Sequence, residues 1–111
     1  MSRHYFKTSH EGSPITVLIG WDRPMNNFFL VIEKPAELVG NSMAFDFLYT
    51  NLQERDPFNH DLDYYRAVLR HFQIVVPESM FIEVQRDFEK KIGNRVANHQ
   101  ADCSFTELAI E

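Results

Sequence analysis

The fold is decided by residues 15–32, which read ITVLIGWDRPMNNFFLVI. Residues 15–19 and 28–32 are rich in β-branched and aromatic side chains, which favours two strands. Between them, Pro24 presets a turn φ angle, and the two Asn residues at 26–27 tolerate a left-handed backbone. The stretch therefore predicts a β-hairpin. Both strands are apolar on both faces, so we expect them in the middle of a sheet.

Two further strands are expected around this hairpin. Residues 5–9 predict an edge strand, which a polar loop at 10–14 joins to the hairpin. Residues 43–49 place an aromatic or other apolar side chain at every second position, and this period predicts a fourth strand with an aromatic face. The connection at 35–42 is expected either as a loop or with a short helical turn around 36–38.

The second half of the chain predicts two helices. Asp61 is placed to cap the first helix, which carries an apolar stripe at spacings of three and four: Leu62, Tyr65, Leu69 and Phe72. In the second helix, Pro77 lies in the first turn and Gly93 just past the end. Its expected buried face consists of Phe81, Val84, Phe88 and Ile92. We expect Asp87 and Lys91 to pair on its outer face.

The expected order of elements gives an α+β domain, in which two helices pack on one face of a four-stranded antiparallel sheet. At 111 residues the chain has the length of one domain, so we expect residues 1–111 to form it. Residues 104–111 are expected as a frayed tail or a short strand. The other sheet face is apolar and uncovered, which predicts a homodimer or a complex with a protein partner.

Composition excludes several classes of protein. With 44% hydrophobic and 14% aromatic residues, the chain has too much apolar mass for a disordered protein. Its longest apolar runs are far shorter than the roughly 20 residues of a membrane-spanning helix. With a formal net charge of -5, the chain lacks the basic footprint of nucleic-acid binding, which disfavours a nucleic acid as a direct partner without excluding it. A single cysteine and the absence of a signal-peptide pattern at the start favour a reducing cytoplasm.

No catalytic or cofactor signature is found in the sequence. We therefore expect no catalytic residue, no cofactor and no metal. The acidic loop 54–63 offers oxygen ligands, but the start of a helix explains its Asp and Asn residues without a cation. His99 and Cys103 would be neighbours on a helix, where the alternatives are a reactive thiolate pair and an ordinary polar segment.

The hairpin turn is the candidate binding site. Trp and Arg are favoured at binding hot spots, and loops carry function more often than the elements they connect. The candidate binding residues are Trp21, Asp22, Arg23, Met25 and Asn26. The alternative is a plain turn, in which Asp22 and Asn26 set the geometry and Trp21 packs against a neighbouring strand.

Four segments resemble a family of small uncharacterised bacterial cytoplasmic proteins. They are GWDRP at 20–24, YTNL at 49–52, VPESM at 76–80 and GNRV at 93–96. The resemblance spans most of the chain. It implies a bacterial cytoplasmic setting and brings neither an activity nor a site residue.

The sequence thus predicts a small non-enzymatic module for protein interaction or regulation, acting as a homodimer or in a complex. The alternative is a small enzyme or ligand-binding protein with a pocket between the sheet and the helices. That pocket would use some of four residues: Asp46, Tyr49, Arg66 and His71. A buried Asp46 with a raised pKa would favour the alternative.

Overall fold

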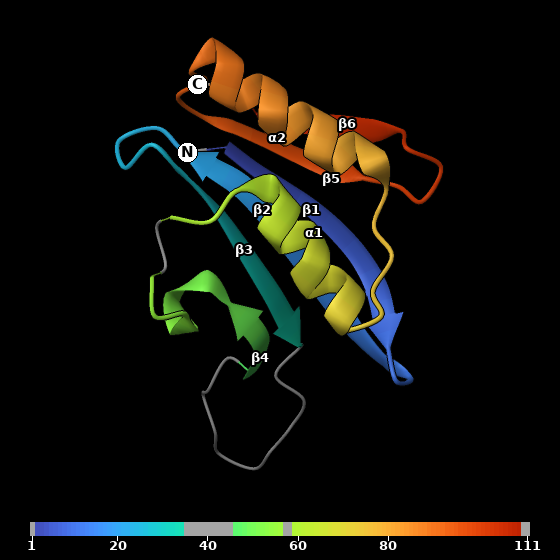
Figure 1. Ribbon diagram of the computed structural model, residues 1–111. Coiled ribbons are helices and arrows are strands. Elements are labelled where there is room, and N and C mark those ends of the chain that lie inside the picture. The colour runs from blue at the N-terminus through green and yellow to red at the C-terminus, as the bar shows by residue number, and fades with distance from the viewer. Residues whose placement is uncertain (1, 35–45, 57–58, 110–111) are drawn as a thin grey trace, which may run out of the picture.

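The computed structural model describes residues 2–34, 46–56 and 59–109 (Figure 1). Within these ranges the elements are β1 (Ser2–His10), β2 (Ser13–Asp22), β3 (Asn27–Lys34), β4 (Asp46–Thr50), the short 3-10 helix η1 (Asn51–Gln53), α1 (Leu62–His71), α2 (Glu78–Lys90), β5 (Arg95–His99) and β6 (Phe105–Ala109). The predicted connection at 35–42 and the first residues of the predicted fourth strand, 43–45, lie outside the described residues.

The six strands form one sheet in the order β4-β3-β2-β1-β5-β6. β1 pairs with β5 in parallel, while the other four pairings are antiparallel. The α+β class is confirmed, but the predicted four-stranded antiparallel sheet is wrong. The edge position predicted for residues 5–9 is wrong as well, because β5 covers that side of β1. Of the two alternatives for 104–111, the structure has a strand, β6.

β5 was missed, and β6 was predicted only as one of two alternatives, because their sequence lacks an apolar alternation. The buried residues of β5 are Ala97 and His99, and neither is a large hydrocarbon side chain. Residues 101–107 are all exposed, so the first half of β6 gives no buried pattern at all. Strands are recognised from alternating apolar side chains, and here that signal is absent.

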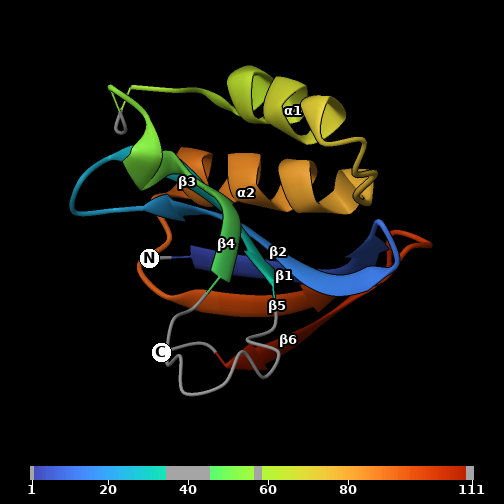
Figure 2. The same cartoon turned by 90° about the horizontal axis from the view of Figure 1, so that it is seen from below.

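The predicted hairpin is confirmed. β2 and β3 pair in register from Thr16 opposite Glu33 to Asp22 opposite Asn27, and both strands lie inside the sheet. Both helices lie on the same face of the sheet (Figure 2). The core between these layers is mainly aliphatic and aromatic; its largest fully buried side chains include Trp21, Tyr65, Ile15, Ile19, Leu30, Ile32 and Met80.

The opposite face of the sheet carries a row of apolar side chains. Tyr5 stands opposite Leu18, and Leu18 opposite Val31, across three neighbouring strands. All three are half-buried. The face is therefore apolar at its centre, and the homodimer or partner complex expected from it stays a prediction.

A residue with a left-handed backbone follows each helix, and the one that follows α2 is not the predicted glycine. Asp61 caps α1 as expected, since its Oδ1 accepts from the Tyr64 amide at 2.9 Å. The left-handed residue that follows α2 is Lys91 (φ 54°), rather than Gly93, and Gln73 (φ 60°) occupies the equivalent place after α1. Pro77 is the N-cap of α2 and precedes its first turn.

In the described part of the chain, neither helix is long and apolar enough to cross a membrane.

Candidate functional site

A chain of hydrogen-bonded polar side chains runs between α2 and strands β1 and β5. The Ser79 Oγ atom lies 2.8 Å from His99 Nδ1, and His99 Nε2 lies 2.8 Å from His4 Nδ1. His4 Nε2 lies 2.7 Å from Asp87 Oδ2. All four residues are buried, and we call them the histidine chain.

The helix and the strands position the histidine chain through their own periodicity. Ser79, Glu83 and Asp87 are spaced four residues apart, so they share one face of α2, and all three are buried. In the parallel pair, His4 stands opposite Ala97 and Phe6 opposite His99, which brings both imidazoles beneath that face. α2 therefore has two buried faces: the predicted apolar one and a polar one.

Asp87 corrects the prediction of an exposed Asp87–Lys91 pair. Its side chain is 0% exposed and bonds His4 and Arg95 instead. The reason is that β5, which the sequence did not reveal, lies against this side of α2. Burial opposes its ionisation, but hydrogen bonds from His4, Arg95 and Ser2 outweigh burial and lower the pKa of Asp87. Asp87 is thus a carboxylate at neutral pH.

Arg95 joins the histidine chain to the surface. Its Nη1 donates to Asp87 Oδ1 at 2.8 Å and its Nη2 to Glu83 Oε1 at 2.7 Å. It also donates to Glu107 of β6. The Arg95 side chain is only 12% exposed. One buried guanidinium is thus held by three carboxylates from two elements.

A pocket of about 260 Å³ opens where this arginine reaches the surface. We call it the α2–β5 pocket; its lining residues are Glu83, Arg86, Asp87, Lys90, Ile92, Asn94, Arg95 and Glu107. The carboxylates of Glu83 and Asp87 are buried, whereas Arg86 and Lys90 are exposed. The pocket is therefore acidic around Arg95 on the inside and basic at its mouth.

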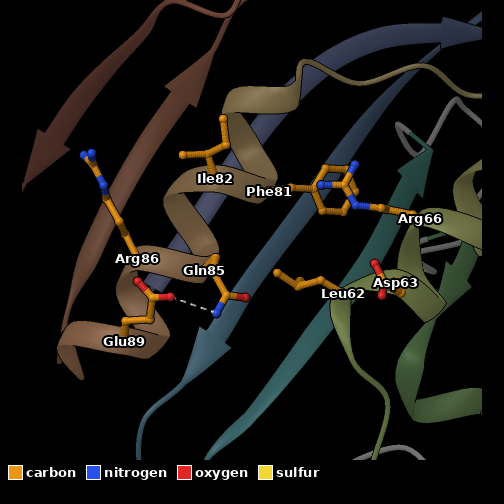
Figure 3. A pocket seen from close by; sticks show the side chains of 8 residues that line it. All are labelled: Leu62, Asp63, Arg66, Phe81, Ile82, Gln85, Arg86 and Glu89. Carbon is orange, nitrogen blue, oxygen red and sulfur yellow. Dashed lines mark hydrogen bonds between the residues drawn. The ribbon is translucent and has the colours of Figure 1, made fainter.

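A second hollow, the interhelix groove, lies between α1 and α2 (Figure 3). It measures about 390 Å³, and its lining residues are Leu62, Asp63, Arg66, Phe81, Ile82, Gln85, Arg86 and Glu89. The Arg66 guanidinium stands 4.0 Å from the centre of the Phe81 ring and donates to Glu78 at 2.7 Å. Ile82 is 51% exposed beside it. The groove has an apolar floor but no buried charge.

The structure places the predicted binding residues of the hairpin turn in different surroundings. Trp21 is 1% exposed and packs edge-on against Phe88, with the ring centres 5.9 Å apart. Its Nε1 has no hydrogen-bond partner among the described residues. Asp22 accepts from the Met25 amide at 3.4 Å, and Asn26 has a φ of 52°, so both shape the turn. Trp21 thus belongs to the core.

The remaining two turn residues are exposed. Met25 is 54% exposed, and Arg23 reaches toward Gly93, where its Nη1 is 3.3 Å from the position a Cβ atom would take. Gly93 adjoins Asn94, which lines the α2–β5 pocket. The turn and the pocket are therefore neighbours, and binding by Arg23 and Met25 stays a prediction.

Of the four residues named for the alternative pocket, the three whose side chains the structure describes do not converge. Tyr49 donates to Glu54 at 2.9 Å, and burial together with Glu54 raises the pKa of Tyr49. Arg66 bonds Glu78, and His71 is exposed. The Asp46 side chain lies outside the description. A pocket between a helix and the sheet does exist, but other residues form it.

His99, a member of the histidine chain, was considered in the sequence only as a possible partner of Cys103. His99 lies in a strand and Cys103 in the exposed turn after it, so the helix that would have made them neighbours is not present. Burial and the neighbouring His4 lower the pKa of His99 to about 4, so its ring is neutral at neutral pH. The repeated spacing of four from Ser79 to Asp87 was the available signal for a second buried helix face.

Comparison of the chain with protein-family models, curated proteins and solved structures finds no match. Across the ranges that the structure describes, no three His, Cys, Asp or Glu side chains are grouped as a metal site.

Proposed function

We propose that the chain is a small non-enzymatic binding module whose ligand occupies the α2–β5 pocket. The observation that carries the proposal is Arg95, a nearly buried cation held by Asp87, Glu83 and Glu107 in the pocket wall. Buried ion pairs cost desolvation and add little net stability compared with hydrocarbon side chains. Their retention in a small domain, at a concave site, is typical of a place where charge serves recognition.

The charge distribution indicates the kind of ligand. Arg95 and Arg86, whose Nη1 lies 3.4 Å from Glu83, together balance two of the three carboxylates, which leaves one net negative charge on the inner wall. The exposed Lys90 and Arg86 make the mouth positive. A complementary ligand has a cationic group that reaches inward to Glu83 and Glu107, and an anionic group that remains at the mouth. Small zwitterions such as free amino acids have this charge pattern. Their size suits a pocket of about 260 Å³.

The groups with catalytic chemistry support binding rather than turnover. Ser79 and His99 line neither the α2–β5 pocket nor the interhelix groove. The ring of Phe105 stacks on His99 with the centres 5.0 Å apart. A nucleophile and its base must reach the substrate, and this pair is covered by its own fold.

Isothermal titration and ¹H–¹⁵N NMR would test the proposal with three panels of matched size: amino acids, amines and carboxylates. We expect amino acids to bind best and to shift amides of Lys90, Asn94 and Arg95. The variants Glu107→Gln and Lys90→Met should each weaken binding about tenfold, which corresponds to the loss of one charged contact. Glu89→Gln, on the same helix but outside this pocket, is the control. Absence of binding in all three panels, or binding that ignores both variants, would refute the proposal.

A protein partner is the second candidate, and the interhelix groove with the exposed Ile82 favours it. The apolar outer face of the sheet favours self-association in the same way. Size-exclusion chromatography with light scattering distinguishes a homodimer from a 13.1 kDa monomer. The setting that we propose for either function, the bacterial cytoplasm, rests on the resemblance of the four segments.

A further inference from the structure

The contact between His4 and His99 restricts where protons can lie. His4 Nδ1 and His99 Nε2 are 2.8 Å apart, a hydrogen bond that needs one hydrogen between two nitrogens. At the other side of the His4 ring, Nε2 is 2.7 Å from the Asp87 carboxylate, which can only accept. His4 Nε2 therefore always carries a hydrogen, and the direction of the remaining hydrogen bonds follows from it.

With both rings neutral, only one arrangement satisfies every contact. His4 has its single hydrogen on Nε2, so its Nδ1 accepts from the Nε2–H of His99. His99 then has a bare Nδ1, which accepts from the Ser79 hydroxyl at 2.8 Å. The hydrogen bonds thus run from Ser79 through His99 and His4 to Asp87.

One added proton changes the far end of the histidine chain, whichever ring holds it. If His4 is the cation, its Nδ1–H donates to a bare His99 Nε2, and the hydrogen of neutral His99 moves to Nδ1. If His99 is the cation, its Nδ1 is protonated directly. In both cases His99 Nδ1–H donates to Ser79 Oγ. A second proton would place two N–H groups and two positive charges face to face at 2.8 Å.

We propose that His4 and His99 form a single proton-binding site, and that uptake of its proton converts Ser79 from hydrogen-bond donor to acceptor. The histidine chain thus links proton uptake near Asp87 to the first turn of α2. It does not depend on the ligand of the α2–β5 pocket.

The charged groups around the site come from α2, β5 and β6. α2 contributes Asp87 and Glu83, and β5 contributes Arg95, which is itself bonded to Glu107 of β6. The two carboxylates of α2 favour the added proton, whereas Arg95 opposes it. On the other side, His4 stands opposite Ile19 of β2, which is uncharged.

Long-range ¹H–¹⁵N NMR of the histidine rings would test this proposal on the full chain. At about pH 8, a pH well above the ordinary histidine pKa, we expect both rings as the Nε2–H form. On acidification toward about pH 4, His99 Nδ1 should become protonated while the two rings together take up one proton. Ser79→Ala removes the acceptor of that hydrogen and should lower the midpoint by about one pH unit. Ser9→Ala, at an exposed serine of β1, should leave it unchanged.

Three results would overturn the proposal. They are an Nδ1–H tautomer of His99 at high pH, separate uptake of two protons by the folded protein, and an unchanged midpoint in Ser79→Ala. Unfolding before either ring takes up a proton would also contradict it, because the site would then not bind a proton in the native fold.

Discussion

The two buried faces of α2 are stabilised by different kinds of contact. One face packs Met80, Phe81 and Val84 against the core, where contact needs shape but no particular partner. The other buries Ser79, Glu83 and Asp87, each of which is bonded to a specific partner on β1 or β5. An apolar face tolerates substitution by a similar volume, whereas a polar face fails when a single partner is lost.

The largest effect is expected from Asp87→Ala. It leaves His4 buried without its carboxylate and Arg95 with only Glu83 and Glu107, and it should cost about 3–5 kcal/mol of unfolding free energy. Urea denaturation followed by circular dichroism measures the loss. Met80→Ala, also fully buried but on the apolar face, should cost about 2–5 kcal/mol with no change in its pH dependence. Equal and pH-independent losses in both variants would remove the distinction between the faces.

The apolar face extends to Trp21, and Trp21→Ala should cost about 3–5 kcal/mol, because the ring is buried against Phe88. Arg23→Ala, two residues along the same turn and exposed, should change stability by less than about 0.5 kcal/mol. Thermal unfolding of both variants provides the comparison. A folded and fully stable Trp21→Ala would show that the turn, rather than the core, accounts for this tryptophan.

The polar face makes stability depend on pH. His99 has a pKa lowered from 6.5 to about 4, so between these values the unfolded chain binds more protons than the folded chain. Stability should therefore be complete above about pH 6.5 and fall by up to about 3 kcal/mol as the pH drops to about 4. Urea midpoints measured across this range check the slope. His99→Gln should flatten the slope, and His71→Gln, at an exposed histidine, should preserve it.

The smallest effect is expected at the end of the histidine chain. Ser79→Ala removes one buried hydroxyl and its bond to His99, which should cost about 1 kcal/mol at neutral pH. Denaturant unfolding resolves a change of this size. If Ser79→Ala raised the unfolding free energy, the buried hydroxyl would destabilise the fold, and the polar face would begin at Glu83.

The same contrast explains how much of the molecule could be predicted. The β2–β3 hairpin follows from two runs of β-branched and aromatic side chains around a turn sequence. Both helices follow from apolar side chains at a period of 3.6, and the start of α1 from Asp61 as a cap. β5 could not be found in this way, because its buried residues are Ala97 and His99 and its other side chains include Arg95 and Asn98. From sequence alone, a polar side chain is predicted to lie on the surface, because the partner that would allow its burial is not known.

The candidate site could not be predicted from the sequence for the same reason. Asp87 and Lys91 have the spacing of an exposed ion pair, and only the position of β5 shows that Asp87 is buried. His4 and His99 are 95 residues apart, so no local pattern links them. The hairpin turn was singled out by residue type, and the structure divides it into a core tryptophan, an exposed methionine and an exposed arginine that reaches toward Gly93 beside the pocket.

The parallel pairing of β1 with β5 also has a consequence for the order of folding. β1 ends at His10 and is therefore synthesised long before β5, its second neighbour in the sheet, which begins at Arg95. During translation the hairpin and both helices can form while β1 still has an open edge and Asp87 still lacks His4 and Arg95 as joint partners. Contacts between such distant segments form slowly, because a long loop must close first. We expect the nascent chain to depend on β5 and β6 to complete this side of the sheet, so that the sheet can assemble fully only after both strands have been synthesised.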